Sequence, residues 1–169
     1  MSSMGFGSRD GLDSSTMRDL SWPCLRQFCV FMENRVGRLH DLLRQLERHQ
    51  LKVIALSIAN SVDCAIVRVM VNDMDRCREI LKLSDFTFAE SDLVGVELPD
   101  DPTPYLKICL ALLRVELNIH YTYPLLYRRE GRGGIALYVD DVDLAVNTLK
   151  ELGHRLITES DLLHGEGQI

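Results

Sequence analysis

The segment from Glu33 to Leu39 has the residue types of a small anion-binding site. Gly37 can adopt a positive φ and lets a ligand approach the main chain closely, and Asn34 can cap a helix or form a hydrogen bond across a neighbouring surface. The amides of a helix that begins here, together with the helix dipole, favour a carboxylate or another anion. Taken alone, such a segment more often forms an ordinary glycine-containing turn between a strand and a helix, and this alternative stays open.

The other residues with reactive side chains do not form a known catalytic or metal-binding pattern. The five histidines share no metal-ligand spacing, and the sequence has no nucleophile motif, phosphate-binding loop or dinucleotide-binding motif. The five cysteines are odd in number and none are spaced as CxxC, which predicts reduced thiols rather than a disulfide framework or a zinc site. We therefore expect no enzyme activity, no metal and no cofactor.

The composition is that of a folded, net-acidic chain. The 169 residues are 46% hydrophobic, and 19 Lys and Arg stand against 25 Asp and Glu, a net charge of −6. No apolar run reaches the ~18 residues that a membrane span needs, and the acidic balance disfavours contact with nucleic acid or anionic lipid. The first residues lack the apolar stretch of a secretory signal, so we expect a cytoplasmic protein with no membrane or nucleic-acid partner.

Helical and strand patterns alternate between two expected tails. Residues 1–25 are rich in Ser, Gly and Asp and are expected to form a flexible amino-terminal tail, and residues 161–169 a carboxy-terminal tail. Residues 128–134, with three arginines and three glycines, have the composition of a loop. The spacing of apolar residues predicts helices over 37–50, 73–83, 105–114 and 141–152, and strands over 27–33, 51–58, 65–71, 86–98, 117–127, 135–139 and 154–158.

The predicted order, strand-helix-strand-strand-helix-strand, occurs twice. At an offset of 66, Leu42 and Leu46 align with Ile108 and Leu112, and beyond residues 128–134 the offset becomes 68. We predict an α+β protein with two ferredoxin-like βαββαβ units side by side, over residues 26–91 and 92–160, each an antiparallel sheet with its helices on one face. Two such sheets aligned edge to edge under a shared helical layer would protect their edge strands.

The pattern of the first copy resembles the ACT domain. The segment Glu33–Leu39, followed by an amphipathic helix that ends in Leu-Lys-Val-Ile-Ala-Leu-Ser-Ile, carries the resemblance, and the segments Glu97–Pro102 and Leu117–Tyr123 resemble the second half of stand-alone tandem ACT proteins. The resemblance covers about residues 26–160. It implies a non-catalytic module that binds an amino acid between adjacent ACT units, where the loop after the first strand of one unit faces the start of the second strand of the other.

Departures from the family pattern distinguish the two copies. Gly37 is kept in the first copy, although Val36 replaces the usual proline. In the second copy Thr103 and Pro104 replace two glycines, and because Pro104 has no N–H and Thr103 resists a positive φ, they predict the cap and first residue of a helix without a ligand role.

The resemblance therefore implies one intact site per chain. The family's asparagine on the second strand is Asn118 in the second copy but Lys52 in the first, so the first loop pairs with Asn118. Tyr121 shares a strand face with two other tyrosines and either packs the sheet or lines the ligand pocket. The predicted ligand-binding residues are Asn34, Arg35, Val36, Gly37, Arg38, Leu39, Asn118 and Tyr121.

Two functions remain open from the sequence. The resemblance favours a regulatory protein that binds a small amino-acid ligand, with further copies of itself in a homo-oligomer or an enzyme of amino-acid metabolism as its partner. The alternative is a structural or regulatory subunit that binds no ligand and acts through protein–protein contacts, which the altered second loop favours.

Overall fold

The computed structural model describes residues 23–164, and the expectations for residues 1–22 and 165–169 lie outside this range. Within residues 23–164, no helix combines the length and the apolar character needed to cross a bilayer. The elements follow in the order β1 (Leu25–Glu33), α1 (Arg38–Arg48), β2 (Val53–Asn60), β3 (Cys64–Val71), α2 (Met74–Leu83), β4 (Thr87–Glu97), α3 (Pro104–Leu113), β5 (Ile119–Arg129), β6 (Arg132–Val139), α4 (Val142–Glu151), β7 (Leu156–Ile157) and α5 (Glu159–His164).

Each unit is an antiparallel half-sheet with two helices on one face, so the predicted fold class is confirmed. In the first unit, Phe28 and Val30 of β1 lie opposite Val69 and Val67 of β3. Because alternate residues of a strand share one face, these side chains form one buried layer. The layer packs with the apolar stripe of α1, represented by Leu42, in the hydrophobic core of the first unit.

Strand β4 belongs to both units. Its first half pairs with β1 as far as Leu93, which lies opposite Leu25, and its second half, from Val94, pairs with β6. Strand β7 continues the line of β1 by pairing with Gly95 and Val96. The boundary predicted at residues 91–92 therefore lies inside one continuous strand, and the sheet order is β2-β3-β1-β4-β6-β5.

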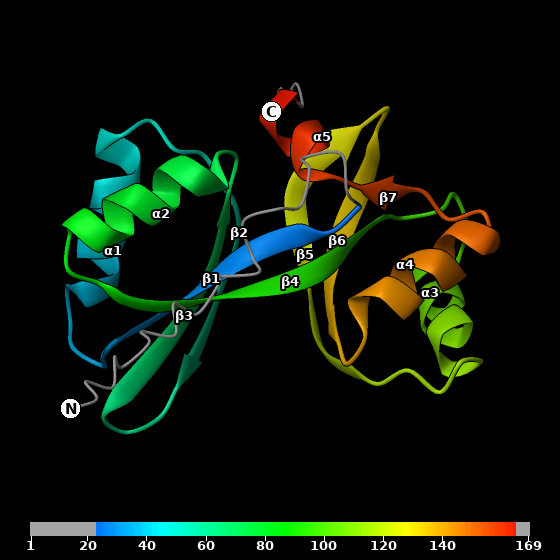
Figure 1. The fold of residues 1–169 in the computed structure, drawn as a ribbon, viewed down its shortest axis with the longest axis horizontal. Helices are drawn as coiled ribbons and strands as arrows, with labels where there is room; N and C mark the ends of the chain where they lie inside the picture. The colour runs from blue at the N-terminus through cyan, green and yellow to red at the C-terminus, as the bar shows by residue number, and fades with distance from the viewer. Residues whose placement is uncertain (1–22, 165–169) are drawn as a thin grey trace, which may run out of the picture.

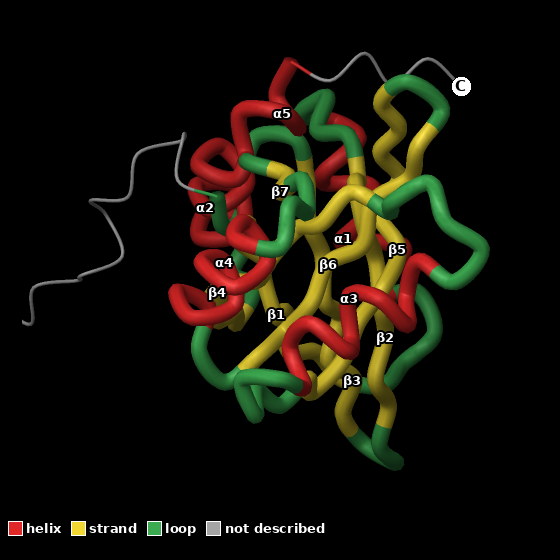
Figure 2. Tube along the Cα trace, turned by 90° about the vertical axis from the view of Figure 1, so that its right-hand side faces the viewer, coloured by secondary structure: helices red, strands yellow, loops and turns green. Residues whose placement is uncertain are grey.

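The two helix pairs lie on opposite sides of the molecule. In Figure 1, α1 and α2 lie at the left and α3 and α4 at the right, with the strands between them. Turned by 90°, the strands curve through the middle of the molecule (Figure 2). The edge strands β2 and β5 come into contact. The expectation of one shared helical layer is therefore wrong, because the sheet curls and the faces without helices meet each other.

Polar and aromatic side chains fill the contact between the two half-sheets. Gln27 of β1 is fully buried, its amide group donates to the hydroxyl of Tyr121, and its carbonyl oxygen accepts a hydrogen bond from Tyr123 at 2.6 Å. The guanidinium of Arg68 lies 4.3 Å from the centre of the Tyr121 ring. A buried amide is tolerated when it is hydrogen-bonded, so these paired groups favour one arrangement of the two half-sheets.

Residues 128–134 mostly extend the β5–β6 hairpin, and the expectation of a loop is wrong for most of them. Arg129 and Arg132 are still paired across the two strands. The turn consists of Glu130 and Gly131, with φ of 51° and 78°. Two positive φ values in a two-residue turn match the right-handed twist of paired strands, so the hairpin continues to its tip.

Helix α5 corrects the predicted carboxy-terminal tail, because residues 161–164 belong to a packed helix. Leu162 is buried. The carboxylate of Asp161 accepts hydrogen bonds from the amide and the hydroxyl of Thr158, at 2.8 and 2.9 Å. This local pairing supports the start of a six-residue helix that is too short to produce a clear apolar period in the sequence.

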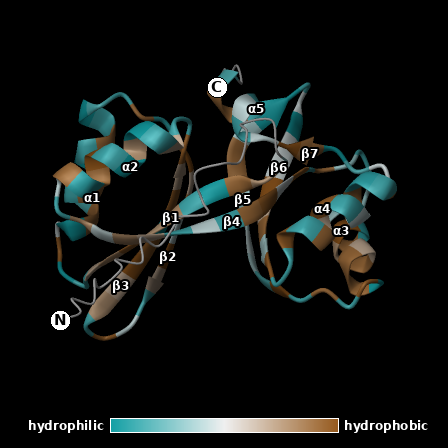
Figure 3. Ribbon diagram, viewed as in Figure 1, coloured by the Kyte–Doolittle hydropathy of each residue, from teal (hydrophilic) through white to brown (hydrophobic). Residues whose placement is uncertain are grey.

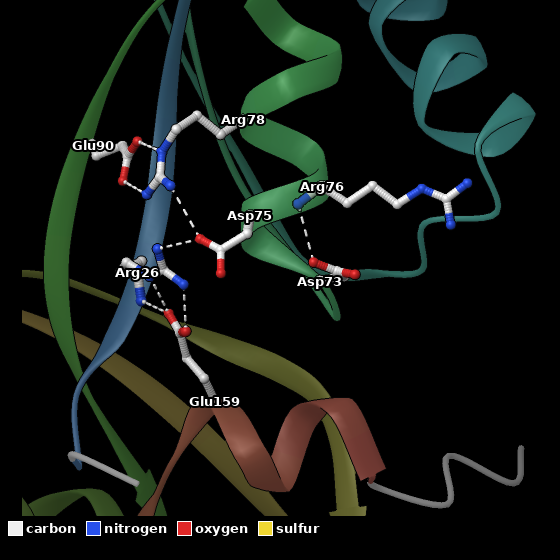
Figure 4. Close-up of polar contacts among 7 residues, drawn as sticks. All are labelled: Arg26, Asp73, Asp75, Arg76, Arg78, Glu90 and Glu159. Carbon is white, nitrogen blue, oxygen red and sulfur yellow. Dashed lines mark hydrogen bonds and ion pairs between the residues drawn. The ribbon is translucent and has the colours of Figure 1, made fainter. Parts of the chain in front are cut away.

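An ion-pair network ties α5 to the first unit (Figure 4). The guanidinium of Arg26 donates to both carboxylate oxygens of Glu159, at 2.6 and 2.7 Å, and to Asp75 of α2 at 2.9 Å. Asp75 also accepts from Arg78, whose guanidinium pairs with Glu90 of β4. The network therefore joins β1, α2, β4 and α5.

Candidate functional site

The loop between β1 and α1 is anchored to the β2–β3 turn. The backbone N–H of Asn34 donates to the carbonyl oxygen of Asp63 at 3.1 Å, and its side-chain amide donates to the carbonyl oxygen of Ser61 at 3.1 Å. Asn34 itself is exposed. Within the described chain, its side-chain oxygen accepts no hydrogen bond and remains available to a ligand.

The helix that follows this loop has no side chain that caps its first turn. Gly37 occupies the N-cap position with φ of 96°, and no atom from beyond its two chain neighbours lies within 4 Å of the position that a Cβ would take. By contrast, Asp73 and Asp141 cap α2 and α4, accepting from backbone N–H groups at 3.0 and 2.9 Å. Since the first amides of a helix need acceptors and the dipole adds partial positive charge, the start of α1 favours an anion.

A recess of about 430 Å³ lies beside this loop. Its lining includes Phe31, Arg35, Arg38, Asp85, Phe86 and Thr87. Phe31 and Thr87 lie opposite each other on β1 and β4, so strand pairing brings the α2–β4 turn next to the loop. No local sequence pattern indicates that the α2–β4 turn lies next to the loop, so the sequence does not predict the residues that this turn contributes to the recess.

The two arginines that were predicted from the loop both line the recess. Arg38 lies with its guanidinium 5.7 Å from the centre of the Phe86 ring. Arg35 pairs with Glu33 at 3.0 Å, and both side chains are largely exposed. Because exposed ion pairs are weak, Arg35 can exchange its partner for a bound carboxylate.

The remaining loop residues have different environments. Val36 is fully exposed. Leu39 is partly buried and packs against the core of the first unit. Leu39 thus holds the first turn of α1 to the sheet, whereas Val36 presents an apolar side chain on the outer surface of the loop.

Tyr121 lies away from the loop within one chain, and Asn118 does not line the recess beside the loop. Tyr121 contacts Gln27 near the start of β1, whereas Asn34 follows its end. Seven residues of strand at roughly 3.3 Å each correspond to about 23 Å. Asn118 is exposed and immediately precedes β5. The recess is thus lined by residues of the loop but not by Asn118 or Tyr121.

Tyr121 is part of the contact between the half-sheets. Its ring is stacked on that of Tyr138, with centroids 4.9 Å apart, and on that of Tyr123, with centroids 6.1 Å apart. Burial raises the pKa of Tyr121. These contacts favour the packing role that the sequence left open for this side chain.

The corresponding loop of the second copy contains a carboxylate of its own, Asp101, that pairs with neighbouring residues. Pro104 is the first residue of α3 and Thr103 its N-cap, as predicted, although within the described residues the Thr103 side chain caps no helix amide. The amide and hydroxyl of Thr103 donate to Asp101 at 2.9 and 3.1 Å, and Lys107 pairs with Asp101 at 2.5 Å. The hydrogen bond from Lys107 lowers the pKa of Asp101, which keeps this carboxylate charged.

No metal-ligand cluster lies among the described residues, and the buried thiol Cys77 has a packing role. Residues 23–164 contain no group of three or more His, Cys, Asp or Glu side chains placed to hold a metal ion. Burial raises the pKa of Cys77 to about 12, so this thiol stays protonated and packs in the core of the first unit. The loop and its recess thus have the chemistry of a binding site for a small anionic or dipolar molecule.

Comparison with known proteins gives a consistent picture. Residues 24–164 match the family model of an ACT domain pair. The crystal structure of protein BT0572 from Bacteroides thetaiotaomicron is similar, with a TM-score of 0.76 and 28% identity over 83% of this chain and 96% of that one. The ligand-free regulatory subunit of aspartate kinase from Thermus thermophilus shares the fold, with a TM-score of 0.51 and 14% identity over 80% and 96% of the two chains. Comparison with curated proteins gave no significant match.

Proposed function

The chain belongs to the ACT domain pair family, whose model covers residues 24–164, and we propose that it is a regulatory protein that binds a free amino acid beside the β1–α1 loop. In this proposal the protein has no catalytic step of its own. Binding changes the stability of one arrangement of the protein relative to another, and a partner responds to that change.

The uncapped start of α1 is the observation that supports this proposal most directly. Gly37 leaves the first-turn amides without a side-chain acceptor, while the helices α2 and α4 of the same chain are capped by aspartates. The α-carboxylate of an amino acid would accept from these amides. Asn34, with its free side-chain oxygen, would accept from the α-ammonium group.

The adjacent recess offers a place for the rest of the ligand. Phe31 and Phe86 supply apolar surface, and Arg35 and Arg38 supply positive charge near a carboxylate. Because Glu33 and Asp85 also line the recess and balance the two arginines, this combination suits an amino acid with an apolar side chain better than one with a charged side chain.

We propose one site per chain, because in the second copy Pro104 removes a first-turn N–H and Asp101 already accepts from the amide of the N-cap residue Thr103. We also propose that Asn118 completes the site from a neighbouring chain, since it does not line the recess of its own chain. A ligand held between two chains would favour the assembly that contains both halves of the site. The neighbouring chain that supplies Asn118 is a second copy of this chain, and an enzyme of amino-acid metabolism would be a further partner that responds to the assembly.

Isothermal titration calorimetry against the common amino acids tests the proposal, after a thermal-shift screen to select candidates. We expect one amino acid class to bind with a stoichiometry of one per chain. Asn118→Ala should weaken binding about 10-fold or more, the loss of a hydrogen bond to a charged group. The matched change Lys52→Ala, at the corresponding position of the first copy, should leave the affinity unchanged.

The loop is tested separately by Gly37→Val. A β-branched residue disfavours a φ of 96° and would distort the start of α1. We expect ligand binding to be lost while the far-ultraviolet circular dichroism stays native. Absence of binding by every amino acid to the wild-type chain would contradict the proposal and favour the alternative, a ligand-free subunit that acts through protein contacts.

A further inference from the structure

Helix α3 has an apolar outer face that no described segment covers. The exposed fractions of Leu106, Leu110 and Leu113 are 54%, 45% and 66%. Tyr105 and Cys109 are also exposed and complete a stripe at the spacing i, i+1, i+4, i+5 and i+8. The opposite side of the helix is buried in the core of the second unit. A helix that is apolar on both sides is normally buried on both sides.

The first unit supplies an internal comparison for this stripe. Helix α1 has the same place in its unit, yet its outer face is polar, and in Figure 3 α3 is mostly brown whereas α1 is largely teal. At the offset of 66 residues, Leu106, Leu110 and Leu113 correspond to His40, Arg44 and Glu47. All three positions of α1 are exposed. Since the fold accepts charged residues there, the leucines of α3 serve a contact outside the described chain.

We propose that α3 is a dimer contact, and that it packs antiparallel against α3 of a second copy of this chain. A twofold axis requires each surface to complement itself, and a continuous apolar stripe about 12 Å long does so through leucine packing. The stripe has no charged side chain, so it does not fit a charged partner surface.

The charges at the two ends of α3 favour the antiparallel direction. Asp100 lies just before the helix and Arg114 directly follows it, and both are exposed. Neither forms an ion pair within the described residues. Antiparallel packing places Arg114 of each copy near the partner's Asp100, whereas parallel packing would bring like charges together.

The size of the stripe predicts a weak dimer. A contact made by one helix face buries an area at the lower end of the range for specific interfaces, so we expect a dissociation constant in the micromolar range. This contact does not involve the β1–α1 loop, and a dimer that persists in Leu110→Glu would leave the proposed ligand site unaffected.

Sedimentation velocity over a range of protein concentrations tests the dimer with a matched pair of variants. Leu110→Glu should raise the dissociation constant about 100-fold or more, because each dimer receives two buried charges. Arg44→Glu places the same residue at the corresponding position of α1 and should leave the dimer intact. A wild-type chain that stays monomeric at high concentration, or a dimer that persists in Leu110→Glu, would overturn the proposal.

Mild oxidation tests the geometry, because Cys109 lies at the centre of the stripe. In antiparallel packing the two Cys109 residues approach each other near the twofold axis, within reach of a disulfide. The wild type and the control Cys64→Ser should form a covalent dimer, and Cys109→Ser should not. A dimer linked through Cys64 instead would refute the α3 contact.

Charge exchange tests the direction of packing. Arg114→Glu and Asp100→Arg should each weaken the dimer several-fold, and the double variant should restore it. Leu110→Glu also tests an alternative in which residues 1–22 of the same chain, and not a second copy, cover the stripe. In that case the wild type would be a monomer and Leu110→Glu would lower its melting temperature by several degrees. That result would show the proposed dimer to be wrong.

Discussion

Removing the Arg26–Glu159 pair should loosen the carboxy-terminal helix from the first unit. The side chains of Arg26 and Glu159 are 17% and 11% exposed, and they are joined by two short hydrogen bonds. Glu159 also accepts from the backbone N–H of Arg26 at 3.2 Å. Glu159→Ala removes the carboxylate and all three hydrogen bonds, while Arg26 keeps its contact with Asp75.

The geometry allows an estimate of the loss. Breaking a buried ion pair by removing one partner costs about 3–5 kcal/mol when the other charge is left unpaired. Asp75 still balances the charge of Arg26, and both side chains retain some exposure. We therefore expect Glu159→Ala to lower the free energy of unfolding by about 2 kcal/mol, which corresponds to roughly 4–8 °C in melting temperature for a chain of this size.

A double-mutant cycle measured by urea unfolding tests this estimate. Arg26→Met keeps the apolar stem of the side chain and removes its charge. The cycle of Glu159→Ala and Arg26→Met should give a coupling energy of about 1.5–3 kcal/mol. The exposed Glu151→Ala on α4 is the control and should change stability by about 0.5 kcal/mol or less. A coupling energy below about 0.5 kcal/mol would refute the argument that this pair holds α5 to β1.

Three further predictions concern stability. Tyr123→Phe leaves the buried oxygen of Gln27 without its donor and should cost about 1–3 kcal/mol in urea unfolding; an unchanged midpoint would count against the inner polar contact. The hydrogen bond from Arg26 lowers the pKa of Asp75 in the folded protein. The contribution of Asp75 to stability is therefore present above the pKa of the unfolded chain, ~3.9, and is lost as the pH falls through the folded pKa. Asp75→Asn should slightly flatten the acid side of the stability curve, since this carboxylate is largely exposed. Burial lowers the pKa of His154, so the unfolded chain binds a proton more readily than the folded chain, and stability falls below pH ~6.5. His154→Gln should therefore lose less stability than the wild type as the pH is lowered from 7.5, and the same slope of stability against pH in both proteins would contradict this.

Several features of this protein follow from local sequence. The apolar residues of α1 and β3 predicted the element order, and Thr103 and Pro104 predicted the start of α3. The repeat at 66 residues predicted two units of one fold. These features depend on interactions between residues a few positions apart, such as a helix face or an N-cap, and the sequence displays those interactions directly.

Other features were decided by tertiary structure. β4 passes through both units, because one strand can pair with β1 over its first half and with β6 over its second half. The recess beside the loop exists because β1–β4 pairing brings Phe86 and Thr87 to Arg38. Helix α5 holds its place through Arg26, which is 133 residues away from Glu159. Each of these depends on which distant surfaces meet, and periodicity shows that a face will be buried but not which partner buries it.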